Sequence, residues 1–203
     1  MRSFDPATAA HLAARRPTIA RHLLWITARN RSTGATESLG LWTGEYTRSF
    51  TIEGAPRDYH GVGAILDLPQ ITGQIGVEVR THRVTLSALS AEAQQLIRGY
   101  DPRLAPAEIH RVLFDPQAPT TPIGAPVRML RGWVDGVTFN EAGSGTGPSE
   151  HTVELTLVSH ARGLTVPLPL RRSDGSYSLR GGDRIGRYCD VSGSVPIHWG
   201  EAR

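Results

Sequence analysis

One stretch of the sequence, RGYDPRLAPAEIHRVLFDP, places a histidine among three acidic side chains. Asp101, Glu108, His110 and Asp115 are residue types used for general acid–base catalysis. The part AEIHRVLFDP predicts a β-strand, in which side chains five positions apart point to opposite faces, so His110 and Asp115 are not a pair. Glu108 and His110 share a face, about 7 Å apart, where only one hydrogen bond can form. We interpret the group as the solvated or interfacial face of a strand with its turns.

Other sequence motifs for catalysis, metal binding or phosphate binding are weak or absent. The eight histidines show no HxH, HxxxH or HExxH spacing, and the chain has no G-x-S-x-G sequence. RGGDRIGRY lacks both the form and the lysine of a phosphate-binding loop. The single Cys189 excludes an internal disulfide and any site with several thiolates from one chain. We therefore expect no catalytic residue, no metal ligand and no cofactor, and we do not expect an enzyme.

Composition narrows the class of protein further. The chain has 203 residues, enough for one domain or two small ones, with 39% apolar and 20% charged residues. No apolar run is long enough for a membrane helix, and the start of the chain does not resemble a secretory signal. The net charge is +3 and all 22 basic residues are arginines, but they are interspersed with acids. We expect neither a membrane span nor sequence-specific nucleic-acid binding.

The apolar pattern predicts a mainly β protein. IARHLLWITARN and ESLGLWTGEY flank a polar, glycine-bearing connector and predict a hairpin whose first strand is covered on both faces. Further short strands, separated by Gly and Pro, favour a small β-barrel or sandwich. A change of apolar parity predicts a bulge or a sharp coil near His82. Short helices are expected near 6–15, with Leu12 on the apolar face, and near 90–99.

The second half of the chain predicts a long hairpin and then an arm. AEIHRVLFDP and VRMLRGWVDGVTFNEAG read as paired strands joined by the proline-rich loop QAPTTPIGAP, and HTVELTLVSHARG alternates cleanly as a further strand. We expect a β-rich domain over residues 1–170, formed from one or two intertwined β subdomains. Residues 171–203, rich in Gly, Ser and Arg, are expected to form an extended arm that packs on the domain or on a neighbour.

Aromatic and arginine side chains near the ends of these elements are the candidate interface. Several rings sit next to glycine or a charge, where half exposure is expected, although core packing is an alternative for each. The candidate interface residues are Trp42, Tyr100, Arg103, Trp133, Arg180, Asp183, Tyr188 and Trp199. The proline-rich loop and the arm are candidate docking segments.

Several short motifs, in order along the chain, resemble a known family. LWTG, a Y-x-G-x-G pattern from Tyr59 to Gly63, VTLSALS, IRGYDPRLAPAEIHRVLFDP and RMLRGWVDG are similar to stretches of the tail-tip hub proteins of long-tailed phages and gene transfer agents. The ending RRSDGSYSLRGGDRIGRYCDVSGSVPIHWG resembles the closing segment of such proteins. Larger members carry more cysteines for a metal cluster. This chain departs from them in having only Cys189, so the cluster is not carried over.

The resemblance implies a structural protein of the virion, made in the bacterial cytoplasm and located at the tail tip. A hub of this kind connects the distal tail ring to the tip and helps close the tail tube, as a homo-oligomer for which a trimer is favoured over a hexamer. Expected neighbours are the distal tail protein, other tail-tip proteins and the tape measure. Two alternatives stay open: a distal-tail-type ring protein, and a carbohydrate-binding or hydrolytic β module of the tail.

Overall fold

The computed structural model describes residues 4–61, 63, 65–68, 70–71, 78–140, 151–167, 173–188 and 192–194. Contacts divide the chain into two compact units, Met1–Gly163 and Leu164–Arg203. We call them the β unit and the C-terminal unit and describe each by itself. The boundary falls at Gly163, before the position 170 expected from composition.

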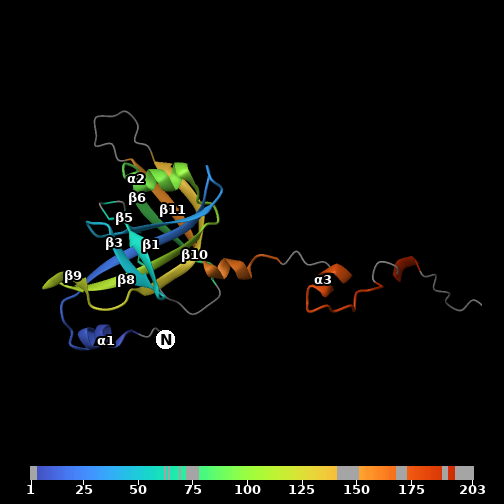
Figure 1. Cartoon of the computed structure of the whole chain (residues 1–203), viewed down its shortest axis with the longest axis horizontal. Coiled ribbons are helices and arrows are strands. Elements are labelled where there is room, and N and C mark those ends of the chain that lie inside the picture. Colours follow the sequence, from blue (N-terminus) through green and yellow to red (C-terminus); the bar gives the residue numbers. More distant parts are fainter. Residues whose placement is uncertain are drawn as a thin grey trace, which may run out of the picture. The chain divides into compact units, whose positions relative to one another are not determined.

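The β unit is built on one large sheet (Figure 1). Its main path runs in the order β2-β1-β8-β10-β11-β6-β5, with β7 beside β1 and β9 beside β8, and all of its pairs are antiparallel. The strands are β1 (Ile19–Asn30), β2 (Thr36–Trp42), β5 (Ile65–Asp67), β6 (Thr81–Ser87), β7 (Tyr100–Asp101), β8 (Pro106–Asp115), β9 (Ala118–Pro122), β10 (Val127–Asn140) and β11 (Thr152–Ser159). The prediction of a mainly β, barrel-like protein with a few short helices is confirmed.

The main core fills the concave side of this curled sheet. Strands from both ends of the sheet contribute to it, including Leu41 of β2, Leu86 of β6 and Ile65 of β5. Val153, Leu155 and Leu157 of β11, whose alternation is the clearest in the sequence, are fully buried there. Because residues from strands far apart in the sheet order share one apolar cluster, the sheet closes around its own inner face.

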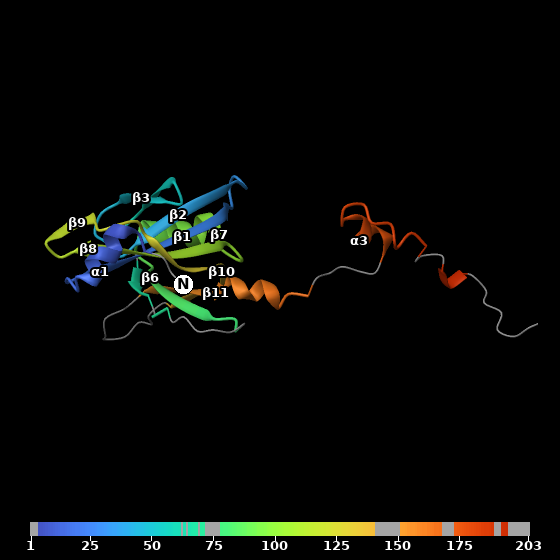
Figure 2. The ribbon, with the colours of Figure 1, turned by 90° about the horizontal axis from the view of Figure 1, so that it is seen from below.

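A second, smaller core lies on the other face of β1 and β8. A hairpin, β3 (Arg48–Ile52) and β4 (Ala55–Tyr59), covers that face (Figure 2). Its members are Leu23, Trp42, Phe50, Ile52, Tyr59, Val112 and Phe114. Leu23 packs in this cluster while Leu24 and Ile26 pack in the main core. This arrangement confirms that β1 is covered on both faces, as its two-sided apolar pattern predicts.

β10 changes its neighbour along its length. It pairs with β8 from Val127 to Trp133 and with β11 from Gly132 to Asn140. The register with β11 shifts between Val134 and Gly136, so Asp135 is an extra residue in the strand. The proline-rich loop expected before β10 instead contains β9, which folds back on β8. Its prolines are tolerated because β9 lies at an edge, where one side of the strand needs no hydrogen bonds.

The short helices lie where the sequence predicts them, with one difference in packing. α1 (Pro6–Ala13) begins at Asp5, whose side chain accepts from the Thr8 backbone. Its buried side chains are Thr8 and His11 rather than the expected apolar face, and Leu12 is 40% exposed. α2 (Ala91–Gln94) is capped by Ser90 and continues as a π-helical turn, η1 (Gln95–Gly99), which buries Leu96.

The bulge expected near His82 is absent from the part of β6 that the structure describes. β6 pairs with β11 in unbroken register from Thr81 to Ser87. His82 is itself buried, at 8% exposure, on the same side as Val84 and Leu86. The alternative expectation, a sharp coil, rests on Val77, which lies outside the described residues.

The C-terminal unit contains a short helix, α3 (Asp174–Ser178), and a 3-10 turn, η3 (Ser192–Ser194); the turn η2 (His160–Leu164) spans the boundary. Ser173 caps α3, and Arg184 forms an ion pair with Asp174 at 3.0 Å. Among its described residues no apolar side chain is buried, whereas Leu179, Ile185 and Tyr188 are 80%, 78% and 67% exposed. Within the described part of the whole chain, no helix is long and apolar enough to cross a membrane.

Candidate functional site

Glu108 and His110 lie under the β3–β4 hairpin, not on a solvated strand face. His110 is 2% exposed, and the Glu108 side chain is 14% exposed. The strand geometry expected for them is correct, but the hairpin covers their side of β8, so the expectation of a solvated face is wrong for these two residues. Asp101 and Asp115 lie elsewhere, and each accepts a backbone hydrogen bond in a turn, from Arg103 and Gln117.

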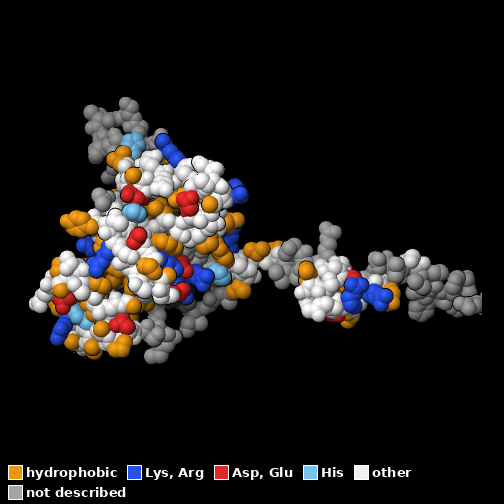
Figure 3. All heavy atoms as spheres, in the orientation of Figure 1, with side chains coloured by type: hydrophobic (Ala, Val, Ile, Leu, Met, Phe, Trp, Pro, Cys, Tyr) orange, Lys and Arg blue, Asp and Glu red, His pale blue; other side chains and the backbone are white. Residues whose placement is uncertain are grey.

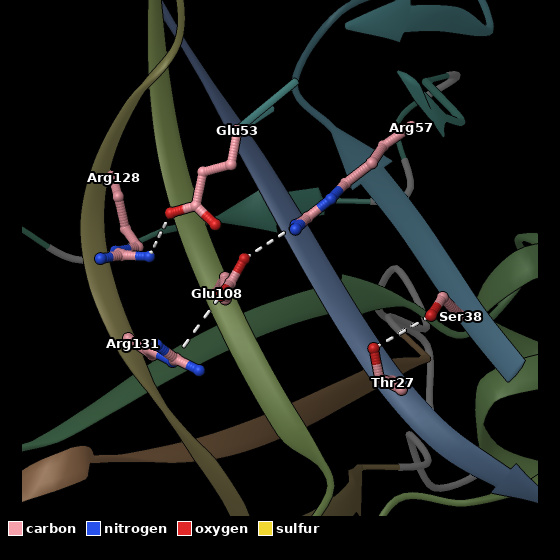
Figure 4. A network of polar contacts seen from close by, with 7 residues as sticks. All are labelled: Thr27, Ser38, Glu53, Arg57, Glu108, Arg128 and Arg131. Atoms are coloured by element: carbon pink, nitrogen blue, oxygen red, sulfur yellow. Dashed lines mark hydrogen bonds and ion pairs between the residues drawn. The ribbon is translucent and has the colours of Figure 1, made fainter. Parts of the chain in front are cut away.

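A network of ion pairs surrounds Glu108 (Figure 4). Arg57 of β4 donates to Glu108 at 2.8 Å, and Arg131 of β10 approaches the other carboxylate oxygen at 3.8 Å. Next to this pair, Arg128 of β10 donates to Glu53, in the turn of the hairpin, at 2.7 Å. Two arginines of β10 and one of β4 thus hold the two carboxylates, and the network ties the hairpin to the sheet.

The electrostatics of this network argue against acid–base work by Glu108 or His110. Burial of the Glu108 carboxyl opposes ionisation, but the hydrogen bond and charge of Arg57 hold its pKa below the usual range. Burial lowers the pKa of His110 to about 4, despite the nearby Glu108 charge. At neutral pH the carboxylate is therefore ionised and paired, and the imidazole is neutral and enclosed. Neither side chain is exposed enough to exchange a proton with a substrate as a general acid or base.

Aromatic rings line the inner side of the hairpin beside this network. The Arg57 guanidinium lies over the Trp25 ring, 5.1 Å from its centroid, and the Trp25 and Tyr59 rings are 5.4 Å apart. Burial raises the pKa of Tyr59 to about 12. Among the described residues, the buried Tyr59 hydroxyl and the His110 Nδ1 have no hydrogen-bond partner. The hairpin is held by packing and by the arginines, with two polar atoms left unsatisfied beneath it.

An apolar groove of about 440 Å³ lies at the other end of the hairpin. Trp42, Phe114 and Pro119 line it, with Tyr46 and Arg48 at its rim. Trp42 is only 7% exposed, so the expectation of a half-exposed ring is wrong there; the ring packs against Phe50 and donates from Nε1 to the Tyr46 carbonyl. Gly44 lies directly against this ring, where a Cβ atom would overlap it. Tyr46, 76% exposed, is the accessible aromatic residue of this groove.

A second groove, of about 540 Å³, lies beside the far half of β10. Ile97, Val137 and Phe139 supply apolar side chains, and Arg103 lies at its margin. Phe139 is 52% exposed. The remaining lining residues are Arg31, Asp101, Pro102, Asp135 and Gly136. This groove brings Arg103 next to apolar and charged side chains, an arrangement suited to a protein contact.

The other candidate interface residues have different surroundings. Tyr100 is 4% exposed and donates to Glu37, so its expected half exposure is also wrong. Trp133 is half-buried and stacks on His160 at 4.5 Å. Arg180, Asp183 and Tyr188 are exposed in the C-terminal unit, where Figure 3 shows apolar and basic side chains on the visible face. Trp199 lies outside the described residues, as does Cys189.

Sequence reasoning missed the partners of Glu108. Arg57 is 51 positions away and sits in a short strand, PRDY, with no clear alternation. Glu53 and Arg128 are 75 positions apart. The available signal was the two-sided apolar pattern of β1, which required an additional layer over one face of the sheet. Identifying β3 and β4 as that layer would have placed their charged residues near β8.

Comparison with known proteins leaves the family open. No model of a known protein family matches the sequence, and a search of the curated proteins finds no significant match. In the described part of the chain, no group of three or more His, Cys, Asp or Glu side chains is arranged to hold a metal ion.

Proposed function

We propose that the chain is a structural component of a phage tail tip, a hub-type protein that connects the distal tail ring to the tip and helps close the tail tube. The observation that carries an assembly role is the exposed apolar surface of the C-terminal unit. Its described part buries no apolar side chain and leaves Leu179, Ile185 and Tyr188 largely in solvent. Large apolar side chains that are exposed in a unit without a buried apolar side chain of its own are candidates for burial against a partner. The unit is an arm that neighbouring proteins cover.

The state of the polar residues supports assembly over chemistry. The side chains that looked most reactive in the sequence, Glu108 and His110, are paired or enclosed. The accessible features are instead two grooves with arginines among their lining residues, and an arm with exposed apolar side chains. Buried apolar anchors with arginine at the margin are typical of protein interfaces.

The short motifs similar to tail-tip hub proteins support the specific assembly proposed. In such an assembly, copies of this chain form a ring, for which a trimer is favoured, and contact the distal tail protein and other tip proteins. Symmetric copies bury their strand edges and arms against each other, which removes the hazard of open edges.

The experiment is cryo-electron microscopy of particles that carry this chain with a fused tag. The expected result is density for the tag at the tail tip, with copies related by the symmetry of the ring. A Leu179→Ser, Tyr188→Ser double variant is expected to be excluded from the particles, whereas Leu89→Ser, which removes a similarly exposed leucine of the β unit, is incorporated. Particles that lack the chain, or that carry it on the capsid, would contradict the proposal.

A carbohydrate-binding module is the second candidate, favoured by the groove under Tyr46. This ring is 76% exposed, and Glu45, Thr47 and Arg48 supply polar groups around it. Such a module binds host glycans through Tyr46, and Tyr46→Ala abolishes that binding while leaving particle assembly intact. Glycan-array binding by the purified chain, lost in Tyr46→Ala, would favour this candidate over the hub.

A further inference from the structure

The far half of β10 has a strand on one side only. From Gly136 to Asn140 it pairs with β11, but its pairing with β8 ends at Trp133. β8 begins at Pro106, and the turn before it forms backbone hydrogen bonds with β10 at Val134, through Leu104 and Ala105. Within the described residues, the backbone of Gly136–Asn140 is therefore an open edge, with main-chain donors and acceptors available for pairing.

The same half of β10 leaves an inward-facing ring uncovered. Phe139 lies opposite Val153, and Val137 lies opposite Leu155; both β11 residues are fully buried in the main core. Directly opposed side chains lie on the same face of a sheet, so Phe139 points to the core side. It is nevertheless 52% exposed, because the groove of about 540 Å³ separates it from η1 and β7. Among the residues that the structure describes, no strand lies beside β10 at this position.

A segment that binds in this groove must meet two structural requirements. It must present unpaired backbone groups to the β10 edge, which requires an extended segment. It must also place apolar side chains on one side only, because the groove continues the concave face of the sheet. The charged lining residues are two arginines, Arg31 and Arg103, and two aspartates, Asp101 and Asp135, which favours an uncharged segment.

One segment of this chain has that pattern. Residues 164–170 read LTVPLPL, with an apolar residue at every second position and no charge. Leu164 and Val166, the apolar residues of this segment that the structure describes, are 74% and 57% exposed. Residues that precede proline favour extended backbone, which applies to Val166 and to Leu168. The prolines therefore favour an extended backbone at Val166 and Leu168, whereas Leu164 is the last residue of the turn η2 and must extend on binding.

The prolines also decide which edge of such a strand can pair. In an extended strand, the backbone groups of alternate residues point to the same edge. Pro167 and Pro169 share a parity, so one edge keeps only the donor of Thr165, while the other, formed by the leucines and Val166, keeps all of its donors. Such a strand can join β10 through the second edge and is poorly suited to recruit a further strand to the first. Seven extended residues span about 23 Å, more than the about 17 Å of a five-residue edge.

We propose that the segment beginning at Leu164 in one copy of this chain adds as a strand to the Gly136–Asn140 edge of β10 in a second copy. Val166 and the alternate leucines then lie against Phe139, Val137 and Ile97 in the groove. The inference rests on the proposed function for the presence of neighbouring copies, and it names the contact that joins them. Repeated around a ring, the contact is head-to-tail, because donor and acceptor surfaces differ.

The first test uses a synthetic peptide of residues 164–170 and the full chain. Amide hydrogen exchange is measured on β10 with and without saturating peptide. Added protection confined to Gly136–Asn140 is expected, and a peptide carrying the Val166→Asp change gives none. Protection that is absent with both peptides would overturn the proposal.

The second test uses two full-length variants and their mixture. Phe139→Glu disables the acceptor groove, and Val166→Asp disables the donor strand; both side chains are exposed, so the β unit retains its fold. Each variant alone is expected to lose self-association by at least about tenfold in sedimentation, whereas a mixture forms a heterodimer through the one intact pair. Leu12→Glu, at an exposed leucine of α1, is the control that associates as the unaltered chain does.

The outcomes separate this inference from the proposed function. If the mixture stays monomeric although the peptide protects β10, the strand docks within its own chain and the proposal is wrong. If Phe139→Glu is built into tail tips with normal stoichiometry, the contact is not the one that joins copies, and the hub function still stands. If strand exchange occurs but the chain is absent from particles, the hub function fails and the contact stands.

Discussion

Arg57 and Glu108 meet at 2.8 Å although 51 positions separate them in the chain. Their side chains are 18% and 14% exposed, so the pair is largely withdrawn from water. It is the shortest polar link between the β3–β4 hairpin and β8, and Arg131 completes it from β10. The stability of the hairpin layer therefore depends on neither charge of this ion pair being left without its partner.

Removing one partner of this pair is expected to be costly. Glu108→Gln leaves Arg57 without a carboxylate in a largely buried position, and we expect the free energy of unfolding to fall by about 2–4 kcal/mol. Chemical denaturation followed by tryptophan fluorescence measures it. The double variant Arg57→Met, Glu108→Leu recovers part of that loss because no charge is left alone. In contrast, Arg83→Met breaks an exposed pair with Glu154 and costs less than about 0.5 kcal/mol. Equal losses in the buried and the exposed pair would contradict this assignment.

His110 makes the stability depend on pH in a definite direction. Its pKa in the folded protein is about 4, against an ordinary value of 6.5, so the unfolded chain takes up the proton first as the pH falls. This contribution is complete above pH 6.5 and is lost progressively down to about pH 4. Between pH 7 and 5 we expect a loss of roughly 2 kcal/mol, since one pKa unit is worth about 1.4 kcal/mol. Burial also lowers the pKa values of His22 and His82, which act in the same direction.

The contribution of His110 can be isolated with a variant that does not titrate. The charges that face it, Glu108 and Glu53 against Arg57 and Arg128, keep their pairings in His110→Gln. Unfolding curves of this variant at pH 7 and pH 5 are expected to differ by much less than those of the unaltered chain. Leu89→Gln, at an exposed leucine that does not titrate, keeps the full difference. An unchanged slope in His110→Gln would show that other groups control the pH response.

Two glycines of β10 should respond in opposite ways to the same change. A Cβ atom at Gly132 would overlap the backbone carbonyl of Val158, whereas one at Gly136 would meet nothing within 4 Å. Gly132→Ala therefore forces β10 away from β11, and we expect it to lower the melting temperature by several degrees, on the order of 2 kcal/mol or more. Gly136→Ala is neutral or slightly stabilising. Thermal unfolding monitored by circular dichroism compares them, and similar losses in both would argue against the β10–β11 packing described above.

Leu104 combines a strained backbone with an exposed side chain. Its φ is 55°, in the left-handed region that disfavours residues with a Cβ atom, and the side chain is 62% exposed. Leu104→Gly is expected to stabilise the isolated chain by about 0.5–1 kcal/mol in denaturant titrations. Leu89→Gly, at an even more exposed leucine without positive φ, is expected to destabilise it slightly. If Leu104→Gly is destabilising, the strain assigned to this turn is wrong.

The elements that could be predicted from the sequence are those whose own residues show which faces are covered, or how the element begins. The alternation of Val153, Leu155 and Leu157 needs only a core on one face, and the capping of α1 by Asp5 is a local contact. The two-sided pattern of β1 even indicated that both faces are covered. Each of these signals is contained within about ten residues, and each prediction is confirmed.

The burial of Glu108 and His110 could not be predicted, because it depends on which part of the chain packs over each face of the sheet. Glu108 and His110 are correctly placed on one face of a strand by parity alone, but parity does not say that a hairpin 50 residues earlier covers it. Likewise, the sequence left half exposure and core packing open for Trp42 and Tyr100, and both are buried. The edge of β10 is open because its pairing with β8 ends at Trp133. No pattern of residues within β10 indicates where that pairing ends.

The lack of a buried apolar core in the described part of the C-terminal unit has a thermodynamic consequence. A segment of this kind is ordered fully only when something covers it, so part of the binding free energy is used to order the chain. Each single contact is then weak and readily reversed. In the ring that we propose, each copy would make several such contacts at once, and the high effective concentration would strengthen the assembly as a whole. A misplaced subunit would then dissociate quickly, while a completed ring would persist.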